Sequence, residues 1–565
     1  MTVDESSSVQ RTPQAQRTPT PIDAIAEKWV ETLADLVPTL ATYIGLDRGK
    51  LGKWEDFSPA GHDAMADAAR AVIAELKPVA PADDVDSVTK DDLLSTLELE
   101  LEKHDLNFHL RDVNVLASPV QTIRETYDIM PTDTEADWAN VSSRLNSAPV
   151  AIDQYIETLR LGIEKGVMPA KRQVLEVILQ CRATADPDGL FAELVAGASG
   201  VPDSLSKDLQ GGALKSANAY GTLADFFEKE LLPVAGEKDA VGRDLYAVAS
   251  RSFLGATVDL DETYEWGVEE LQRMVDEQTS IASEIKPGAS VEEAIEFLNE
   301  DSSRKLHGTE ALQKWMQETS DRAIAELGKT HFDIPEQIRT LECMIAPSHT
   351  GIIYYTGPTD DFSRPGRMWW SVPAGVTEFD TWRELTTVYH EGVPGHHLQI
   401  AQAVYNRATL NSYRRLLAGT SGHAEGWALY AERLMEELGY LDDPADRLGM
   451  LDGQRMRAAR VVLDIGVHLE KQRPDGKGPW TGDYAFDFMG KNVNMNPEFV
   501  RFEVNRYLGW PGQAPSYKVG QRIWEQIRDE YKAREGAAFS PKAFHKKALD
   551  IGGVGLDTLK DALLK

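Results

Sequence analysis

The residues best suited to chemistry lie in one short stretch, YHEGVPGHHLQ, over 389–399. It holds three histidines and a glutamate within eight positions, at His390, Glu391, His396 and His397. Imidazole nitrogens and carboxylate oxygens are the donors that Zn²⁺ takes in catalytic sites, and a glutamate directly after a ligating histidine can act as general base. The stretch therefore predicts a metal-dependent hydrolase site with His390 as one ligand and Glu391 as the base.

The spacing of the histidines does not fit an unbroken helix. In the common pattern H-E-x-x-H, the two histidines lie one turn apart on one face of a helix. His396 follows His390 by six positions, which on a straight helix means about 600° of rotation and roughly 9 Å of rise, so the rings face different ways. His397 returns to the same face but lies about 10.5 Å along the axis, too far to share an ion. One ion can therefore be bound only if the helix breaks.

Val393, Pro394 and Gly395 can supply this break. Proline disfavours helical geometry at the residue before it and lacks a backbone donor, while glycine adds conformational freedom. A bulge or break here can absorb two extra positions and bring the histidines face to face. At this point either His396 or His397 can be the second ligand. A metal-free loop that is merely rich in histidine is the alternative, because such pairs are common at solvated helix ends.

A third ligand is offered by the segment GHAEGWALYAERL, which begins at Gly422. Its apolar residues recur at helical spacing and place Glu425 near the start of a helix, towards the core. The segment resembles the one that carries the third zinc ligand in gluzincin metallopeptidases, so the resemblance implies that Glu425 completes the ligand set. A carboxylate that complements the helix dipole is the ordinary alternative. His423 and Glu432 are secondary candidates, and Glu432 is expected to support a ligand instead of binding the ion.

The motif H-E-G-x-P-G-H-H-x-Q and the segment E-G-W-A-L-Y together resemble the family called domain of unknown function 885. Further matching stretches begin at Gly166 (GVMPAKRQV), Arg457 (RAARVVLDIGVH) and Arg506 (RYLGWPGQAPSYKVG), so the resemblance spans nearly the whole chain. That family is grouped with the thermolysin-like zincins. The resemblance implies a zincin-like fold, one Zn²⁺ ion per chain and metallopeptidase activity, with Glu391 as the base.

Patterns in related gluzincins favour His396 over His397. Oligopeptidases similar to thimet oligopeptidase use H-E-x-G-H, and dipeptidyl peptidase III uses H-E-x-x-G-H. This chain is similar if it is aligned as H-E-x-x-x-G-H, with the Gly-His pair kept in register. The resemblance thus implies His390, His396 and Glu425 as zinc ligands, with His397 as the alternate second ligand. Cobalt or manganese would fit the same donors.

Further residues could complete the site. Peptide hydrolysis develops negative charge on the carbonyl oxygen, and a hydrogen-bond donor opposite the metal stabilises that charge. Zinc peptidases that resemble angiotensin-converting enzyme use a histidine and a tyrosine from late in the chain, which by analogy are His468 and Tyr517 here. Core packing is the ordinary alternative for both. One of Arg455, Arg457 and Arg460 could bind a peptide carboxylate, although an exposed helix face is the more common place for arginine.

Helices must position most of these side chains. The stretch EFDTWRELTTVYHE from Glu378 has helical apolar spacing and ends at the His-Glu pair, and HHLQIAQAVY from His396 continues as a second helix. The best strand patterns occur between Leu341 and Pro373, in GIIYYTGP and RMWWSVP, directly before the motif helix. Helical patterns dominate elsewhere. The sequence therefore predicts a mainly α protein with a small β-sheet next to the active-site helix.

Three regions are expected along the chain. Residues 1–22 are polar and rich in Ser, Thr, Pro and Gln, which predicts a disordered tail that is not a secretory signal. The helical patterns over 23–335 predict a large N-terminal region that walls a cleft, and 336–565 are expected to form the zincin-like catalytic region. By analogy with related peptidases, a deep cleft would admit short peptides and exclude folded proteins.

The composition limits the partners. The 565 residues include 59 basic and 91 acidic side chains, for a net charge of −32, which disfavours nucleic acid and anionic membranes as partners. Only two cysteines occur, which suits a reducing cytoplasm, and no apolar run is long enough to span a membrane. We therefore expect a cytoplasmic enzyme that acts on a short peptide or another small amide. The sequence leaves the oligomeric state open.

Two other functions fit the same residues. A non-peptide zinc amidase or esterase would use the same ligands and the same base. A catalytically silent helical binding protein would keep the fold without the metal. The intact Glu391 favours an active enzyme over a silent one.

Overall fold

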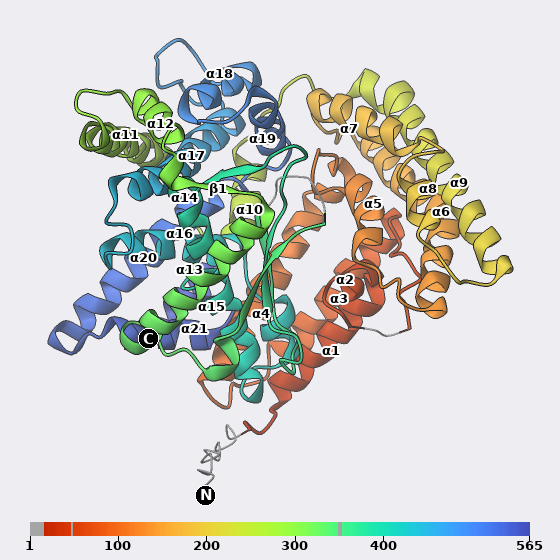
Figure 1. Cartoon of the computed structure of the whole chain (residues 1–565). Coiled ribbons are helices and arrows are strands. Elements are labelled where there is room, and N and C mark those ends of the chain that lie inside the picture. Colours follow the sequence, from red (N-terminus) through yellow and green to blue (C-terminus); the bar gives the residue numbers. More distant parts are fainter. Residues whose placement is uncertain (1–15, 47–48, 348–352) are drawn as a thin grey trace, which may run out of the picture.

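Helices dominate the computed structural model, which describes residues 16–46, 49–347 and 353–565 (Figure 1). The prediction of a mainly α protein is confirmed. None of the helices in the described ranges combines the length and the apolar character needed to cross a bilayer. In Figure 1 the helices of the first part of the chain, α1 to α9, lie to one side, and most of those of the second part lie to the other.

The helices of the first part enclose two hydrophobic clusters. One is formed mainly by α5 to α9, and the other by α1, α3 and α4 together with Tyr413 from much later in the chain. The helices are α1 (Pro21–Leu36), α2 (Pro38–Tyr43), α3 (Pro59–Leu76), α4 (Asp84–Asp105), α5 (Pro119–Ile129), α6 (Glu135–Lys165), α7 (Lys171–Thr184), α8 (Leu190–Ala196) and α9 (Asp203–Phe226).

A third and larger hydrophobic core runs from Tyr246 to Leu563. It contains helices before residue 335 as well as after it, so the packing groups α10 to α13 with the site helices, whereas the sequence prediction ended the N-terminal region at 335. The helices are α10 (Arg243–Leu254), α11 (Leu260–Ile285), α12 (Val291–Asn299), α13 (Thr309–Thr330), α14 (Thr381–Glu391), α15 (His396–Tyr405), α16 (Ser421–Glu437), α17 (Pro444–His468), α18 (Gly482–Asn492), α19 (Pro497–Gly509), α20 (Ser516–Glu535), α21 (Pro541–Ile551) and α22 (Leu556–Leu564).

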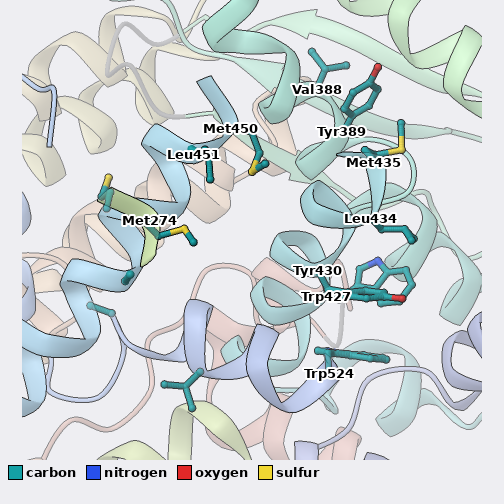
Figure 2. Close-up of a cluster of buried hydrophobic side chains, with 14 of the residues drawn as sticks. Met274, Val388, Tyr389, Trp427, Tyr430, Leu434, Met435, Met450, Leu451 and Trp524 are labelled. Atoms are coloured by element: carbon teal, nitrogen blue, oxygen red, sulfur yellow. The ribbon is translucent and has the colours of Figure 1, made fainter. Parts of the chain in front are cut away.

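Large apolar side chains lock the helices that carry the candidate site. Figure 2 shows Trp427 and Tyr430 of α16 close to Trp524 of α20, with Met450 of α17 in the same cluster. The rings of Trp427 and Trp524 are both buried, with centroids 5.0 Å apart. Burying a large apolar side chain stabilises a fold by about 1.5–3 kcal/mol. The helices that carry the site are therefore packed together through buried aromatic and aliphatic side chains.

Two small sheets flank the site helices. Strands β2 (Leu341–Ile345), β4 (Gly366–Trp370) and β3 (Ile353–Thr356) form one sheet in that order, with β2 parallel and β3 antiparallel to β4. Strand β1 (Lys305–His307) pairs antiparallel with β5 (Glu378–Asp380), which leads directly into α14. The predicted small sheet is confirmed, although residues 348–352 lie outside the described part of the chain.

The described chain begins with ordered contacts. Residues 1–15 of the expected tail lie outside the described part. Helix α1 begins at Pro21, capped by the Thr20 side chain. Before it, the Arg17 guanidinium pairs with carboxylates that include Asp83, at 2.7 Å. The last residues of the segment 1–22 therefore belong to the fold.

Candidate metal centre

The helix that carries the motif is broken where the sequence predicts. Helix α14 ends at Glu391 and α15 begins at His396, with four residues between them. The Val393–Pro394 peptide bond is cis, and the N–H of Gly395 donates to the carbonyl of Tyr389 at 3.0 Å. The interruption turns the chain so that the first residue of α15 faces the last residues of α14.

Two contacts hold the broken segment in place. A Cβ on Gly395 would lie 1.9 Å from the carbonyl oxygen of His390, so only glycine fits this close approach. The indole N–H of Trp427 on α16 donates to the carbonyl of Pro394 at 2.8 Å. Because Trp427 lies two positions after Glu425, this bond ties the break to the helix that supplies the third candidate ligand.

His390, His396 and Glu425 meet at one point. Nε2 of His390 lies 3.3 Å from Oε2 of Glu425, and Nε2 of His396 lies 3.6 Å from the same oxygen. The three ligand atoms lie within 4.8 Å of one another, and the two rings are nearly perpendicular, at 89°. Both histidines are buried. The three residues that the sequence predicts as ligands are thus brought together.

The donor set fits a divalent metal ion. Two donors about 2.1 Å from a tetrahedral Zn²⁺ lie about 3.4 Å apart, which is close to the separations from Glu425 to the two imidazoles. Oε2 of Glu425 is buried and has no hydrogen-bond partner in the described ranges. A buried carboxylate oxygen without a partner is costly, and a bound cation would remove that cost.

A second carboxylate orients His390. Nδ1 of His390 lies 2.7 Å from Oε1 of Glu432, and because a carboxylate accepts, Nδ1 donates to it, which leaves Nε2 as the nitrogen that points to Glu425 and is available to a metal ion. Metal-binding histidines in proteins are usually held in this way. Glu432 thus supports a ligand, as predicted. For His396, Nδ1 has no hydrogen-bond partner among the described residues, so His390 is the more firmly oriented of the two.

A chain of hydrogen bonds continues from Glu432 into the core. Gln454 of α17 donates from Nε2 to Oε2 of Glu432 at 3.0 Å, and the buried ammonium of Lys518 donates to Oε1 of Gln454 at 2.7 Å. Lys518 also pairs with Glu270 at 3.0 Å. The sequence analysis missed Gln454, because no local pattern marks a glutamine on a helix face that only packing brings to Glu432.

The protonation equilibria reflect a cluster of carboxylates around two imidazoles. Burial opposes protonation of His390, but the neighbouring carboxylates of Glu425 and Glu432 outweigh it and raise the pKa of His390 to about 10. Burial likewise opposes ionisation of Glu425, but the two histidines hold its pKa well below the usual range. The carboxylates around the two imidazoles therefore stabilise a positive charge placed between them.

Glu391 lies within this cluster. Its side chain is buried, and burial raises its pKa, while the charges of His396 and His390 act in the opposite direction. A carboxyl that is buried beside the ligand atoms can accept a proton and release it again, as a general base does.

His397 is separate from the ligand group. Its Nε2 lies 2.7 Å from the carbonyl oxygen of Ile338 and its Nδ1 lies 2.9 Å from the Tyr355 hydroxyl. Because the carbonyl only accepts, Nε2 donates to it and Nδ1 accepts from Tyr355. Burial lowers the pKa of His397 to about 4. Both ring nitrogens are occupied in tying α15 to β3 and to the segment before β2, so the structure brings together His396, and not His397, with the other ligands.

Tyr517 of α20 lies near the ligand group. Burial raises the pKa of its phenol, and the charge of Glu425 raises it further, so the hydroxyl keeps its proton at neutral pH. The guanidinium of Arg460 lies 5.1 Å from the centre of its ring. Tyr517 is thus near enough to the predicted ligand Glu425 for the charge of that carboxylate to act on its phenol.

His468 lies elsewhere. It is the last residue of α17, eleven positions after Arg457, which corresponds to about 16 Å along the helix axis. Its Nε2 lies 3.1 Å from the Tyr507 carbonyl, to which it donates, and its ring stacks on Tyr246 at 5.6 Å. These are contacts of a buried core histidine, and the role of His468 in catalysis stays a prediction.

The fold and the site define a mainly helical protein with a buried group of two histidines and one glutamate that could hold a metal ion. The chain belongs to the family described as "Bacterial protein of unknown function (DUF885)", whose model matches residues 38–563. The resemblance to this family, which the sequence motifs indicated, is therefore confirmed. A comparison with curated proteins found no match.

Two solved structures are similar over nearly their whole length. A "putative lipoprotein" from Colwellia psychrerythraea has a TM-score of 0.82 at 22% identity, over 96% of this chain and 98% of that chain. A "putative lipoprotein of unknown function" from Shewanella oneidensis has a TM-score of 0.75 at 17% identity, over 97% of this chain and 100% of that chain. At these identities the likeness establishes the fold.

Proposed function

We propose that this protein is a zincin-like, zinc-dependent hydrolase that cleaves peptide bonds in short peptides. One observation carries the proposal: His390, His396 and Glu425 converge at distances that suit one ion, with the carboxyl of Glu391 beside them. The resemblance of the motifs to gluzincins supports a peptide bond as the target instead of another amide or an ester.

The residues of the chain take separate roles in this proposal. His390, His396 and Glu425 would hold Zn²⁺, which when bound supplies Lewis acidity that activates water and polarises a carbonyl group. The carboxylate of Glu391 would accept the proton from the attacking water and pass it to the leaving amine nitrogen. Glu432 would hold the proton on Nδ1 of His390, so that Nε2 is the nitrogen that gives up its proton when the metal binds.

Tyr517 is proposed as the donor to the carbonyl oxygen of the scissile bond. Its hydroxyl retains the proton at neutral pH and lies near Glu425. A fixed donor aimed at developing negative charge stabilises the transition state by about 2.7–4 kcal/mol. His468 is left out of this proposal because of its distance along α17.

The decisive experiment combines metal analysis with a peptide digest. Protein purified without added metal is expected to contain close to one equivalent of zinc per chain and to cleave a mixed peptide library. A chelator and the variant Glu391→Gln should each abolish cleavage. Glu384→Gln, on the same helix α14, is the matched control and should cleave normally. Cleavage that survives the chelator, or an unimpaired Glu391→Gln variant, would remove the proposed mechanism.

The cytoplasmic location is also a proposal. It is supported by two free cysteines, Cys181 and Cys343, which are both buried and need no oxidising compartment. The two similar solved structures are described as lipoproteins, a class that belongs to the cell envelope. Cell fractionation followed by immunodetection decides between the two compartments.

A further inference from the structure

Three arginines lie beside the ligand group with one glutamate among them. Arg460 and Arg506 both donate to Oε2 of Glu503, at 2.7 and 3.0 Å, and the Tyr507 hydroxyl donates to the same carboxylate. Arg457 has no ion pair and no hydrogen bond to any residue in the described ranges, and its Nε is buried. Of the three arginines, Arg457 is thus the one that no carboxylate in the described part of the chain pairs with directly.

The position of Arg457 follows from its neighbours on α17. Arg457 follows Gln454 by three positions and precedes Arg460 by three, so it is a neighbour of each of them on the surface of the helix. Gln454 contacts Glu432, and Arg460 lies over the ring of Tyr517. Arg457 thus lies between the residue that supports His390 and the tyrosine beside Glu425.

The electrostatics agree with this placement. The charge of Arg457 acts on Glu391 and Glu432 and on the phenol of Tyr517, although burial is the largest influence on the pKa of each of these three groups. Arg457 is therefore near enough for its charge to act on the site, and no described carboxylate of the ligand group pairs with it. A guanidinium with a buried, unsatisfied donor is costly in a folded protein unless a ligand satisfies it.

We infer that Arg457, backed by Arg460 and Arg506, binds a carboxylate of the substrate next to the metal ligands. The planar guanidinium presents paired donors that match a carboxylate, with charge on both partners. This inference rests on the proposed function and narrows it to peptides with a carboxylate close to the scissile bond. That carboxylate is either the C-terminal one or the side chain of an aspartate or glutamate.

The test measures binding without turnover. The full-length, zinc-loaded Glu391→Gln variant is immobilised and exposed to a pool of N-acetylated tripeptides in three forms: free C-terminal acids, neutral C-terminal amides, and amides with Asp or Glu at the last position. Mass spectrometry quantifies what is retained. We expect the free acids to be retained about tenfold better than the neutral amides, because a charge-assisted contact has about that effect. If the source is a side chain, the acidic amides will show that advantage.

Substitutions at two arginines of α17 assign the effect. Arg457→Gln in the same background should reduce the preference for acids to less than about twofold, and Arg457→Lys should restore part of it, because the charge returns without the planar fork. Arg455→Gln is the matched control, because Arg455 donates instead to Gln278 and Asn492, and it should keep the full preference. Thermal melting of each variant verifies that it is folded.

Several results would overturn the inference: equal retention of acids and neutral amides by the parent, no retention of any form, or a preference that survives Arg457→Gln. The comparison on the parent stands even if a variant does not fold. Failure of the proposed function gives a different result. In that case the chain with Glu391 intact does not cleave peptides, whatever the binding preference of the variant.

Discussion

Among single residues, Glu432 determines which nitrogen of His390 is available to an ion. Its carboxylate can only accept from Nδ1, so the proton is fixed there, and Nε2 is directed to Glu425. Gln454 holds Glu432 in turn. The ring therefore reaches its place already oriented, which lowers the cost of ordering it when a metal binds.

Replacing Glu432 by Gln is expected to weaken zinc binding by about 10–100-fold while leaving the three ligands in place. Gln can still contact His390, but it no longer fixes the proton on Nδ1 by charge. Competition with a chromophoric chelator measures the affinity. Glu436→Gln, one turn further along α16, is the control, since Glu436 pairs with Arg433 at 2.7 Å instead. Equal affinities for the two variants would count against the role given to Glu432.

The two adjacent histidines provide another test. His396→Ala should reduce the bound zinc to near zero, because it removes one of three donors. His397→Ala should keep the metal but lower the melting temperature, since it breaks two hydrogen bonds, one of them buried, that join α15 to its neighbours. Metal content and thermal unfolding are measured on both variants. Loss of metal from His397→Ala alone would reverse the assignment of the second ligand.

Among the elements, the crossing of α16 and α20 decides whether Glu425 and Tyr517 lie together. The helices approach so closely that a Cβ on Gly426 would lie 2.4 Å from the backbone carbon of Gly520, and a Cβ on Gly520 would lie 2.3 Å from the oxygen of Gly422. Backbone atoms cannot move aside as a flexible side chain can, so this approach requires glycine.

Gly426→Ala is therefore expected to destabilise the protein by about 1–3 kcal/mol, because an added methyl group overpacks the crossing. It should also weaken zinc binding, because Glu425 is the preceding residue. Urea unfolding measures the first effect and chelator competition measures the second. In the control Gly490→Ala, on α18, the added Cβ meets nothing within 4 Å, and stability should rise by about 0.5–1 kcal/mol. A neutral effect at Gly426 would show that the two helices can separate.

At the scale of the whole molecule, Asp92 joins a helix from the first part of the chain to the last helix. It lies on α4 and is 2% exposed, and its carboxylate accepts from the Tyr413 hydroxyl and from the backbone N–H of Gly555, both at 2.7 Å. Burial raises the pKa of Asp92, and the charge of the buried Arg414 acts against that rise. One carboxylate thus links α4 to the segment before α16 and to the start of α22.

Asp92→Ala is expected to destabilise the protein by about 3–5 kcal/mol, because it leaves the buried charge of Arg414 without its nearby carboxylate. Denaturant unfolding gives the value. The neighbouring Asp91→Ala serves as control. Asp91 is exposed and pairs with Lys565 at 3.5 Å, a surface ion pair worth less than about 1 kcal/mol. Similar losses for both variants would refute the structural role of Asp92.

The sequence by itself determined the features that follow from local rules. Helical periodicity gave the mainly α fold, and β-branched and aromatic runs located β3 and β4. Pro394 and Gly395 marked the position of the helix break. A break was required because a continuous helix cannot bring His390 and a later histidine to one ion. Donor chemistry and the motifs then indicated Glu425. These inferences need only neighbours in sequence or residues within one motif.

Only the tertiary structure decided which side chains meet across the molecule. It selected His396 over His397, brought Gln454 to Glu432, and placed His468 in the core. It also grouped α10 to α13 with the site helices. The physical reason is that a helix offers every face to its surroundings, and the burial of apolar side chains over the whole chain chooses which face meets which neighbour.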